Sequence, residues 1–152
     1  MRTILKTTLR SLIALGLCTF AISSALAQND FVQAAAKEPG AKVTDSGLIF
    51  RSLQEGQGSS PMASDKVKVH YRGTFPDGRE FDSSYKRNQA IEFPLNGVIP
   101  CWTEGVQLMK VGGKAKLTCP PAIAYGSRGA GGVIPPNATL QFEVELVAIA
   151  GK

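Results

Sequence analysis

The sequence of 152 residues is poor in the residue types on which most enzyme chemistry depends, with one histidine, three cysteines and one tryptophan. A zinc site needs several histidine or cysteine ligands at close spacing, and the two cysteines beyond residue 27, Cys101 and Cys119, form no CxxC pair. The one histidine, His70, lies in an alternating segment, where a structural role fits better than that of a catalytic base. We therefore predict no metal site, no cofactor and no nucleophilic catalysis.

Signals for binding nucleotides and nucleic acids are also missing. The glycine-rich run 129–132 lies between a tyrosine and a proline pair instead of joining a strand to a helix, which argues against a phosphate-binding loop. The net charge of +5 comes partly from three basic residues among the first 27. Beyond them, 14 basic and 12 acidic residues leave a net charge of +2, and no basic run contains interleaved aromatics. We expect no nucleic-acid partner.

No apolar run reaches the roughly 20 residues that a membrane-spanning helix needs. The first 27 residues have the three parts of a secretory signal peptide: a basic segment (1–10), a short apolar core (12–22) and the small-x-small sequence Ala25-Leu26-Ala27. Cleavage there leaves Gln28 as the first mature residue. We predict an exported protein, periplasmic or secreted, that does not contact the membrane after signal cleavage.

The mature chain is long enough for one domain. Residues 28–45 are predicted to be a short, mobile N-terminal tail, in which 29–37 forms two helical turns that Pro39 ends. The domain itself is predicted at 46–152. Because the tail offers few apolar residues for a helical interface, we expect a monomer.

Alternation of apolar and polar residues predicts most of the strands. The clearest case is 67–72, where Val67, Val69 and Tyr71 are apolar and their neighbours polar. A short helix is expected from Trp102, because Trp102, Val106 and Met109 have helical spacing. Further strands are expected at 48–54 (with Leu48, Phe50 and Leu53 inward), 80–84, 91–93, 114–119 and 139–149, with a long loop at 122–136. The pattern indicates an α+β fold, an antiparallel β half-barrel wrapped around one short α-helix.

The candidate site residues are mostly aromatic or β-branched: Tyr71, Phe81, Asp82, Phe93, Val98, Ile99, Trp102, Tyr125, Ile134 and Phe142. A single carboxylate among them gives no acid–base pair. Such a set suits an apolar pocket with a few hydrogen bonds and a reaction without proton transfer. The alternative is that Trp102 and its neighbours only pack the core, as large aromatics on an apolar stripe usually do.

Five motifs in register carry a resemblance that covers about Ser46 to Ile149: Val69-His70-Tyr71-Arg72-Gly73, Gly78-Arg79-Glu80-Phe81-Asp82-Ser83-Ser84, Gly97-Val98-Ile99-Pro100 with Trp102-Thr103-Glu104-Gly105, Ala124-Tyr125-Gly126, and Ile134-Pro135-Pro136-Asn137-Ala138-Thr139-Leu140. With these motifs the sequence closely resembles the FKBP-type peptidyl-prolyl cis-trans isomerases, the macrolide-binding immunophilins. The signal peptide and short lead-in look like the secreted bacterial members related to macrophage infectivity potentiators. Those members often carry a long N-terminal dimerisation segment, whereas this chain has only 28–45 in its place.

The resemblance implies a function and a role for each site residue. It implies rotation of X–Pro bonds in proline-containing polypeptides during folding, and inhibition by macrolides of the immunosuppressant type. Trp102 would form the pocket floor, and the Ile99 N–H and the Tyr125 hydroxyl would bind substrate carbonyls. Asp82 would lie at the edge, tied to Tyr71 and Arg87. The walls would be Tyr71, Phe81, Phe93, Val98, Ile99 and Phe142. Ile91 would sit at the rim, where relatives often have an aromatic residue, and Ile134 is a further candidate for substrate binding. The alternative function is a non-catalytic prolyl-peptide-binding module or a holdase chaperone.

Cys101 and Cys119 leave two possibilities open. They could form a disulfide that closes a loop of 18 residues, or they could remain buried free thiols, since cysteine packs as a small hydrophobe. Nothing in the sequence fixes the distance between them, and we favour the free thiols.

Overall fold

The computed structural model describes residues 17–151, with the side chains of the first helix from Ser24 onward. The basic segment (1–10) and the first part of the apolar core (12–16) of the predicted signal peptide, as well as Lys152, lie outside these described residues. The elements follow one another as α1 (Leu17–Ala36), β1 (Ala41–Val43), β2 (Ile49–Gln54), β3 (Lys66–Thr74), β4 (Glu80–Ser83), β5 (Ile91–Pro94), the 3-10 helix η1 (Leu95–Gly97), α2 (Pro100–Gln107), β6 (Lys114–Cys119), the 3-10 helices η2 (Pro121–Ile123) and η3 (Gly126–Arg128), and β7 (Leu140–Ile149).

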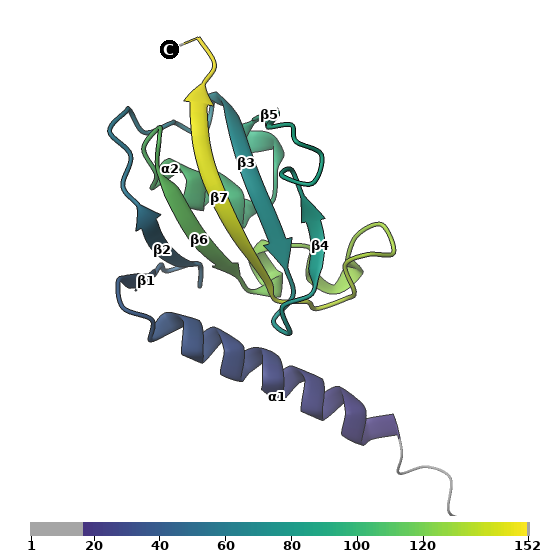
Figure 1. Ribbon diagram of the computed structural model, residues 1–152. Coiled ribbons are helices and arrows are strands. Elements are labelled where there is room, and N and C mark those ends of the chain that lie inside the picture. Colours follow the sequence, from purple (N-terminus) through teal and green to yellow (C-terminus); the bar gives the residue numbers. More distant parts are fainter. Residues whose placement is uncertain (1–16, 152) are drawn as a thin grey trace, which may run out of the picture.

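The strands form one antiparallel sheet in the order β1-β2-β6-β7-β3-β4. The long strand β3 organises it, because β7 pairs with β3 from Val67 to Thr74 on one side. On the other side β3 pairs with β5 over its first half and with β4 over its second half. The short helix α2 lies behind the curved sheet (Figure 1). The predicted α+β fold with an antiparallel sheet and a short central helix is confirmed.

The core lies between this sheet and α2. Along β7 the residues Leu140, Phe142, Val144 and Leu146 point inward and are at most 4% exposed, whereas the residues between them are partly exposed. This period of two follows from the pleat, which turns successive side chains to opposite faces. The buried face of α2, formed by Cys101, Trp102, Gly105 and Val106, covers the same side.

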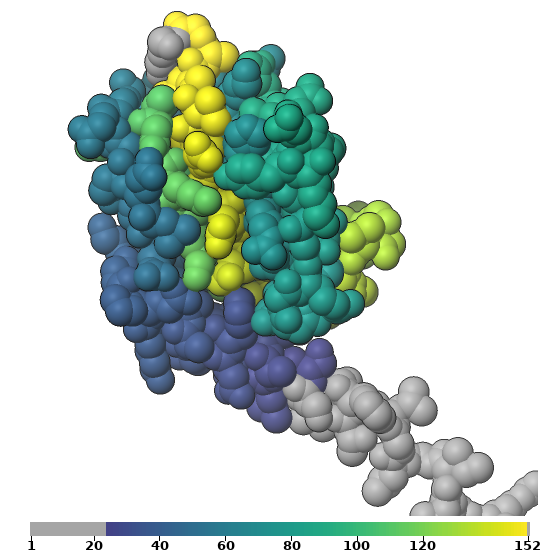
Figure 2. All heavy atoms as spheres, in the orientation of Figure 1, coloured from purple at the N-terminus to yellow at the C-terminus, as the bar shows by residue number. Residues whose placement is uncertain are grey.

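The predicted mobile tail is packed against the domain along much of its length. Helix α1 runs unbroken through the predicted cleavage site after Ala27, and β1 extends the sheet to Ala41, ahead of the predicted domain start at residue 46. Ala35 is 5% exposed, and the backbone N–H of Thr139 donates to Gln28 Oε1 at 2.6 Å. Figure 2 shows α1 against one end of the sheet. Tertiary contacts thus support the helical part of the mature tail, which as an isolated two-turn helix would be marginal. None of the described helices is long and apolar enough to cross a membrane.

Two local predictions are wrong. Leu53 is 40% exposed instead of facing inward, because Phe50 is buried and the pleat of the strand places residue 53, three positions further on, on the opposite face. Cys101 and Cys119 form a disulfide, with their Cα atoms 5.8 Å apart, where we favoured free thiols. The start of α2 packs on the end of β6, a contact that the local sequence pattern does not encode.

Candidate functional site

A pocket of about 610 Å³ opens on the side of the sheet that faces α2. Ten of the twelve predicted site residues line it: Tyr71, Phe81, Asp82, Ile91, Phe93, Val98, Ile99, Trp102, Tyr125 and Phe142. They come from β3, β4, β5, the start of α2, the loop after β6, and β7. The curvature of the sheet therefore brings together residues that lie up to 71 positions apart in the sequence.

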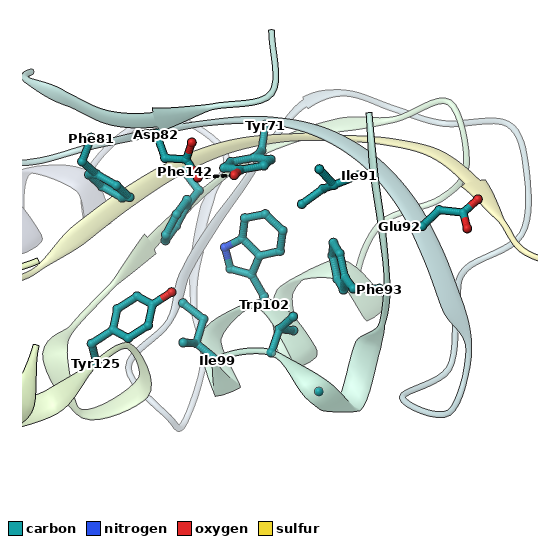
Figure 3. A pocket seen from close by; sticks show the side chains of 12 residues that line it. Tyr71, Phe81, Asp82, Ile91, Glu92, Phe93, Ile99, Trp102, Tyr125 and Phe142 are labelled. Carbon is teal, nitrogen blue, oxygen red and sulfur yellow. Dashed lines mark hydrogen bonds between the residues drawn. The ribbon is translucent and has the colours of Figure 1, made fainter. Parts of the chain in front are cut away.

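Trp102 forms the floor of this pocket (Figure 3). It lies in the first turn of α2, which begins at Pro100, a position where the missing N–H of proline costs no helical hydrogen bond. Its ring is 5% exposed, and its centroid lies 5.2 Å from those of Tyr71 and Phe142 and 5.5 Å from that of Phe93. The Tyr71 and Phe142 contacts are edge-to-face, an arrangement that aromatic pairs prefer. The buried indole N–H has no hydrogen-bond partner among the described residues.

The wall beside β3 depends on a glycine. A Cβ at Gly73 would lie 2.5 Å from the ring of Phe81 and 3.1 Å from that of Phe142. Because position 73 has no side chain, both rings pack over β3 and meet edge-to-face with centroids 5.6 Å apart. Gly73 follows Tyr71-Arg72 in one of the motifs that carry the family resemblance, and this close approach gives a physical reason for it.

Three polar side chains form a network at the edge of the pocket. The Tyr71 hydroxyl donates to Asp82, and Arg87 donates to Asp82 Oδ1 at 2.5 Å and to the Tyr71 hydroxyl at 3.0 Å. Burial alone raises the pKa of Asp82, but the hydrogen bonds from Tyr71 and Arg87 and the positive guanidinium outweigh it, so the pKa lies below its usual value. Burial and, next, the bond to Asp82 raise the pKa of Tyr71 above its usual value. At neutral pH the network therefore holds a carboxylate and a neutral phenol.

Besides the Trp102 indole N–H, two further hydrogen-bond donors at the pocket have no partner within the described chain, the Ile99 N–H and the Tyr125 hydroxyl. The Ile99 carbonyl accepts from the N–H groups of Trp102 (2.9 Å) and Thr103 (3.1 Å), but the Ile99 N–H has no partner there. The preceding residue, Val98, is extended, which keeps this N–H out of the helix. Tyr125 follows the 3-10 helix η2, is 40% exposed, and its hydroxyl likewise has no partner among the described residues. In Figure 3 Tyr125 and Ile99 lie on the same side of Trp102.

Two predicted residues do not line the pocket. Arg87 does not border the cavity; it donates hydrogen bonds to two residues that do, Asp82 and Tyr71. Ile134 is 7% exposed and packs in the hydrophobic core, where its backbone bridge to Ala130 holds the loop.

Two lining residues, Glu92 and Gly97, were missed. Glu92 is the polar residue of the alternation in β5; its carboxylate points away from the pocket in Figure 3 and pairs with Lys66 at 3.1 Å. Gly97 has no side chain and borders the pocket through its backbone. Gly97 belongs to the same motif as Val98 and Ile99, and this membership was the one sequence feature that could have placed it at the pocket.

The arrangement suits binding of an apolar ring with hydrogen bonds to flanking carbonyl groups. Of the two carboxylates that line the pocket, Glu92 points away from it and pairs with Lys66, and Asp82 is paired with an arginine and a phenol, so no acid–base couple faces the cavity. Within residues 17–151 no group of three or more histidine, cysteine, aspartate or glutamate side chains is placed to hold a metal ion.

Comparisons with known proteins agree with this geometry. Residues 57–147 match the sequence profile of the FKBP-type peptidyl-prolyl cis-trans isomerases. The chain is 51% identical over 119 residues to the FKBP-type 22 kDa peptidyl-prolyl cis-trans isomerase of Escherichia coli K12, covering 78% of this chain and 58% of the relative. It is 54% identical over 120 residues to FkpA of Aeromonas hydrophila, covering 79% of this chain and 44% of the relative. The chain thus spans about half the length of these curated relatives.

Solved structures give the same result. The crystal structure of FkpA from Escherichia coli superposes with a TM-score of 0.81 at 44% identity, covering 86% of this chain and 61% of the other. The peptidyl-prolyl cis-trans isomerase of Pseudomonas syringae pv. tomato superposes with a TM-score of 0.77 at 37% identity, covering 85% and 95%. The chain belongs to the FKBP-type peptidyl-prolyl cis-trans isomerase family.

Proposed function

We propose that this chain accelerates cis–trans rotation about X–Pro bonds in polypeptides that fold outside the cytoplasm. The observation that carries the proposal is the aromatic cavity floored by Trp102, beside which the Ile99 N–H and the Tyr125 hydroxyl have no partner within the described chain. Family membership supports the same activity.

The chemistry of the amide explains why such a cavity suffices. Rotation about the peptide bond has a barrier of roughly 20 kcal/mol because resonance stabilises the planar form. Water stabilises the polar planar amide more than the twisted one, in which conjugation is lost. A cavity walled by Tyr71, Phe93 and Phe142 replaces that water with apolar rings, which favours the twisted transition state over the ground state. No proton transfer is needed.

Each proposed catalytic residue then has a role that its surroundings support. Trp102 seats the proline ring, since it forms the floor of the cavity and its ring contacts three other aromatic rings. The Ile99 N–H and the Tyr125 hydroxyl hold carbonyl groups on either side of that ring. Asp82 orients Tyr71, and Arg87 keeps Asp82 ionised.

A protease-coupled assay on a short X–Pro peptide tests the proposal. We expect the chain to accelerate isomerisation and a macrolide of the immunosuppressant type to abolish the effect. Binding of the peptide without acceleration would instead indicate a non-catalytic prolyl-peptide-binding module. Suppression of aggregation of a proline-free client without isomerase activity would indicate a holdase chaperone.

We further propose that the protein is exported and, once the first 27 residues are removed, monomeric. The basic, apolar and small-x-small segments of the N-terminus support export. For the monomer, the support is that the buried residue of α1, Ala35, packs against its own domain and so is not available to a second copy. N-terminal sequencing of the exported protein should begin at Gln28. Light scattering on that product at micromolar concentration should give the mass of one chain; a stable dimer would disprove the monomer.

A further inference from the structure

The Cys101–Cys119 disulfide joins two of the segments that line the pocket, the start of α2 and the chain that follows β6. Cys101 is the second residue of α2, directly before Trp102 and two residues after Ile99. Cys119 is the last residue of β6, and the chain from it runs through η2 to Tyr125. Both cysteines are fully buried. The cross-link therefore ties the floor and the Ile99 donor to the start of the segment that carries the Tyr125 donor.

Few polar contacts hold the start of α2 in place. The helix is eight residues long and no side chain caps its first N–H groups, and a helix this short is marginal without tertiary contacts. Besides the ring contacts of Trp102, the Thr103 hydroxyl donates to the Leu95 carbonyl at 2.7 Å, and Ser46 donates to Glu104 at 2.5 Å. These bonds fix one side of the first two turns. The disulfide is the covalent restraint on the side that faces β6.

We propose that Cys101 and Cys119 are positioning residues for prolyl isomerisation, whose disulfide holds Trp102, Ile99 and Tyr125 in their relative places. The inference rests on the proposed function. A cavity that acts by shape and fixed donors is sensitive to small displacements, because misplacement by about 1 Å can cost up to a hundredfold in rate. The form with the disulfide intact is then the fully active form, which suits a protein that works in an oxidising compartment.

The test compares five proteins by prolyl-peptide kcat/KM: the oxidised wild type, C101A, C119A, the C101A/C119A double variant, and L146A as a matched control. Leu146 is fully buried, does not line the pocket, and lies toward the opposite end of β7 from Leu140, the residue that pairs with Cys119. L146A therefore destabilises the fold without touching the cross-link or the pocket. Assays are made well below every melting temperature, with circular dichroism confirming the fold.

We expect each cysteine variant to lose about tenfold in kcat/KM, and the double variant to lose no more than either single variant, since one bond is lost in all three. L146A should keep the wild-type value. Treatment of the wild type with a phosphine, which is oxidised to its oxide as the disulfide becomes two thiols, should reproduce the loss and leave the double variant unchanged.

Trp102 provides a second readout, because it is the one tryptophan of the chain. Its fluorescence should become more accessible to acrylamide when the disulfide is removed, but not in L146A. Unchanged kcat/KM in folded, disulfide-free protein would overturn the inference, as would an equal loss in L146A. An oxidised wild type without isomerase activity would overturn the proposed function instead, so the two failures are distinguishable.

Discussion

Two tyrosines on opposite faces of the sheet each donate a hydroxyl to a carboxylate, in surroundings that differ. Tyr71 of β3 faces the pocket and donates to Asp82. Tyr85 lies over the outer face, stacks on His70 with ring centroids 4.9 Å apart, and donates to Glu145 at 3.0 Å. The alternation of β3 places the two pairs on opposite faces, since His70 and Tyr71 are adjacent in the sequence.

The comparison shows that the hydroxyl–carboxylate bond by itself does not make a site. Tyr71 is 7% exposed, lies edge-on to Trp102, and has Arg87 to balance the charge of its partner. Tyr85 is 41% exposed, and the Lys114 ammonium lies over its ring, 5.8 Å from the centroid. What distinguishes the inner pair is the aromatic enclosure around it. Variants that damage one face and spare the other therefore test the assignment of the site.

The largest effect is expected at the pocket floor. Trp102→Ala should weaken binding of prolyl peptide and macrolide and lower kcat/KM far more than tenfold. It should also lower the free energy of unfolding by about 3–5 kcal/mol, because it leaves a cavity under three aromatic rings. Urea denaturation and the coupled peptide assay measure the two losses separately.

Leu146→Ala provides the control for this variant. It removes a fully buried side chain that does not line the pocket, at a cost of about 2–5 kcal/mol. We expect it to retain activity under conditions in which it remains folded. If Leu146→Ala loses as much activity as Trp102→Ala, the losses report on the fold, and the pocket assignment is wrong.

The disulfide should come next in its effect on stability. In the chain-entropy model, closing a loop of this length stabilises the folded state by about 3 kcal/mol. Urea denaturation should show this difference in the free energy of unfolding. The midpoint of the phosphine-reduced protein should lie at a lower urea concentration than that of the oxidised protein, with nearly the same total change in the spectroscopic signal. A shift near zero would mean that the unfolded chain is not constrained by the cross-link as the loop model requires.

A smaller effect is expected from Asp82→Asn, about tenfold in kcat/KM, or about 1.4 kcal/mol. The asparagine keeps the shape but weakens the bond that orients Tyr71 and loses the ion pair with Arg87. Because the pKa of Asp82 lies below its usual value, the carboxylate stays ionised from pH 5 to 8, and wild type and variant should both be flat in that range.

The stabilisation that Asp82 gives by being ionised is present above its unfolded pKa and is lost as the pH falls through the lower folded pKa. Any decline in wild-type stability from this group therefore belongs below about pH 4. A steep acid limb between pH 5 and 8 in the rate of the wild type, absent from Asp82→Asn, would contradict catalysis without proton transfer.

The features that the sequence predicts well are those governed by local periodicity. Val67, Val69 and Tyr71 alternate with polar residues, and each is buried as that period requires. The pocket residues could be named because their motifs keep their order and spacing, and the structure brings ten of the twelve together at the cavity. Local pattern plus family resemblance was sufficient for these parts.

The features that the sequence did not reveal depend on contacts between distant segments. The disulfide depends on α2 meeting the end of β6, and the docking of α1 depends on Gln28 reaching Thr139, 111 positions away. Ile134 packs inward because its loop folds back on Ala130. None of these leaves a periodic signal in the chain itself.

The smallest effect is expected on the outer face. Tyr85→Phe should leave kcat/KM within about twofold of the wild type and lower the free energy of unfolding by less than about 1 kcal/mol at pH 7, because a largely exposed bond competes with water. Tyr71→Phe, the matched change on the inner face, should lower kcat/KM several-fold. Equal effects of the two changes would remove the distinction between the faces.

The contribution of the Tyr85–Glu145 pair to stability can be measured at alkaline pH. Burial and, next, the bond to Glu145 raise the pKa of Tyr85 from 10.0 to about 12 in the folded protein. The stabilisation linked to this group is therefore complete below pH 10 and is lost as the pH rises from 10 to about 12, where the unfolded chain holds fewer protons than the folded one. Tyr71 contributes in the same direction, since its pKa is also raised.

Urea denaturation between pH 9 and 12 should thus show a shallower decline of the free energy of unfolding in Tyr85→Phe than in the wild type, with activity at pH 7 unchanged. An identical decline in the two proteins would mean that Tyr85 titrates like an exposed tyrosine and that its bond to Glu145 contributes nothing in solution.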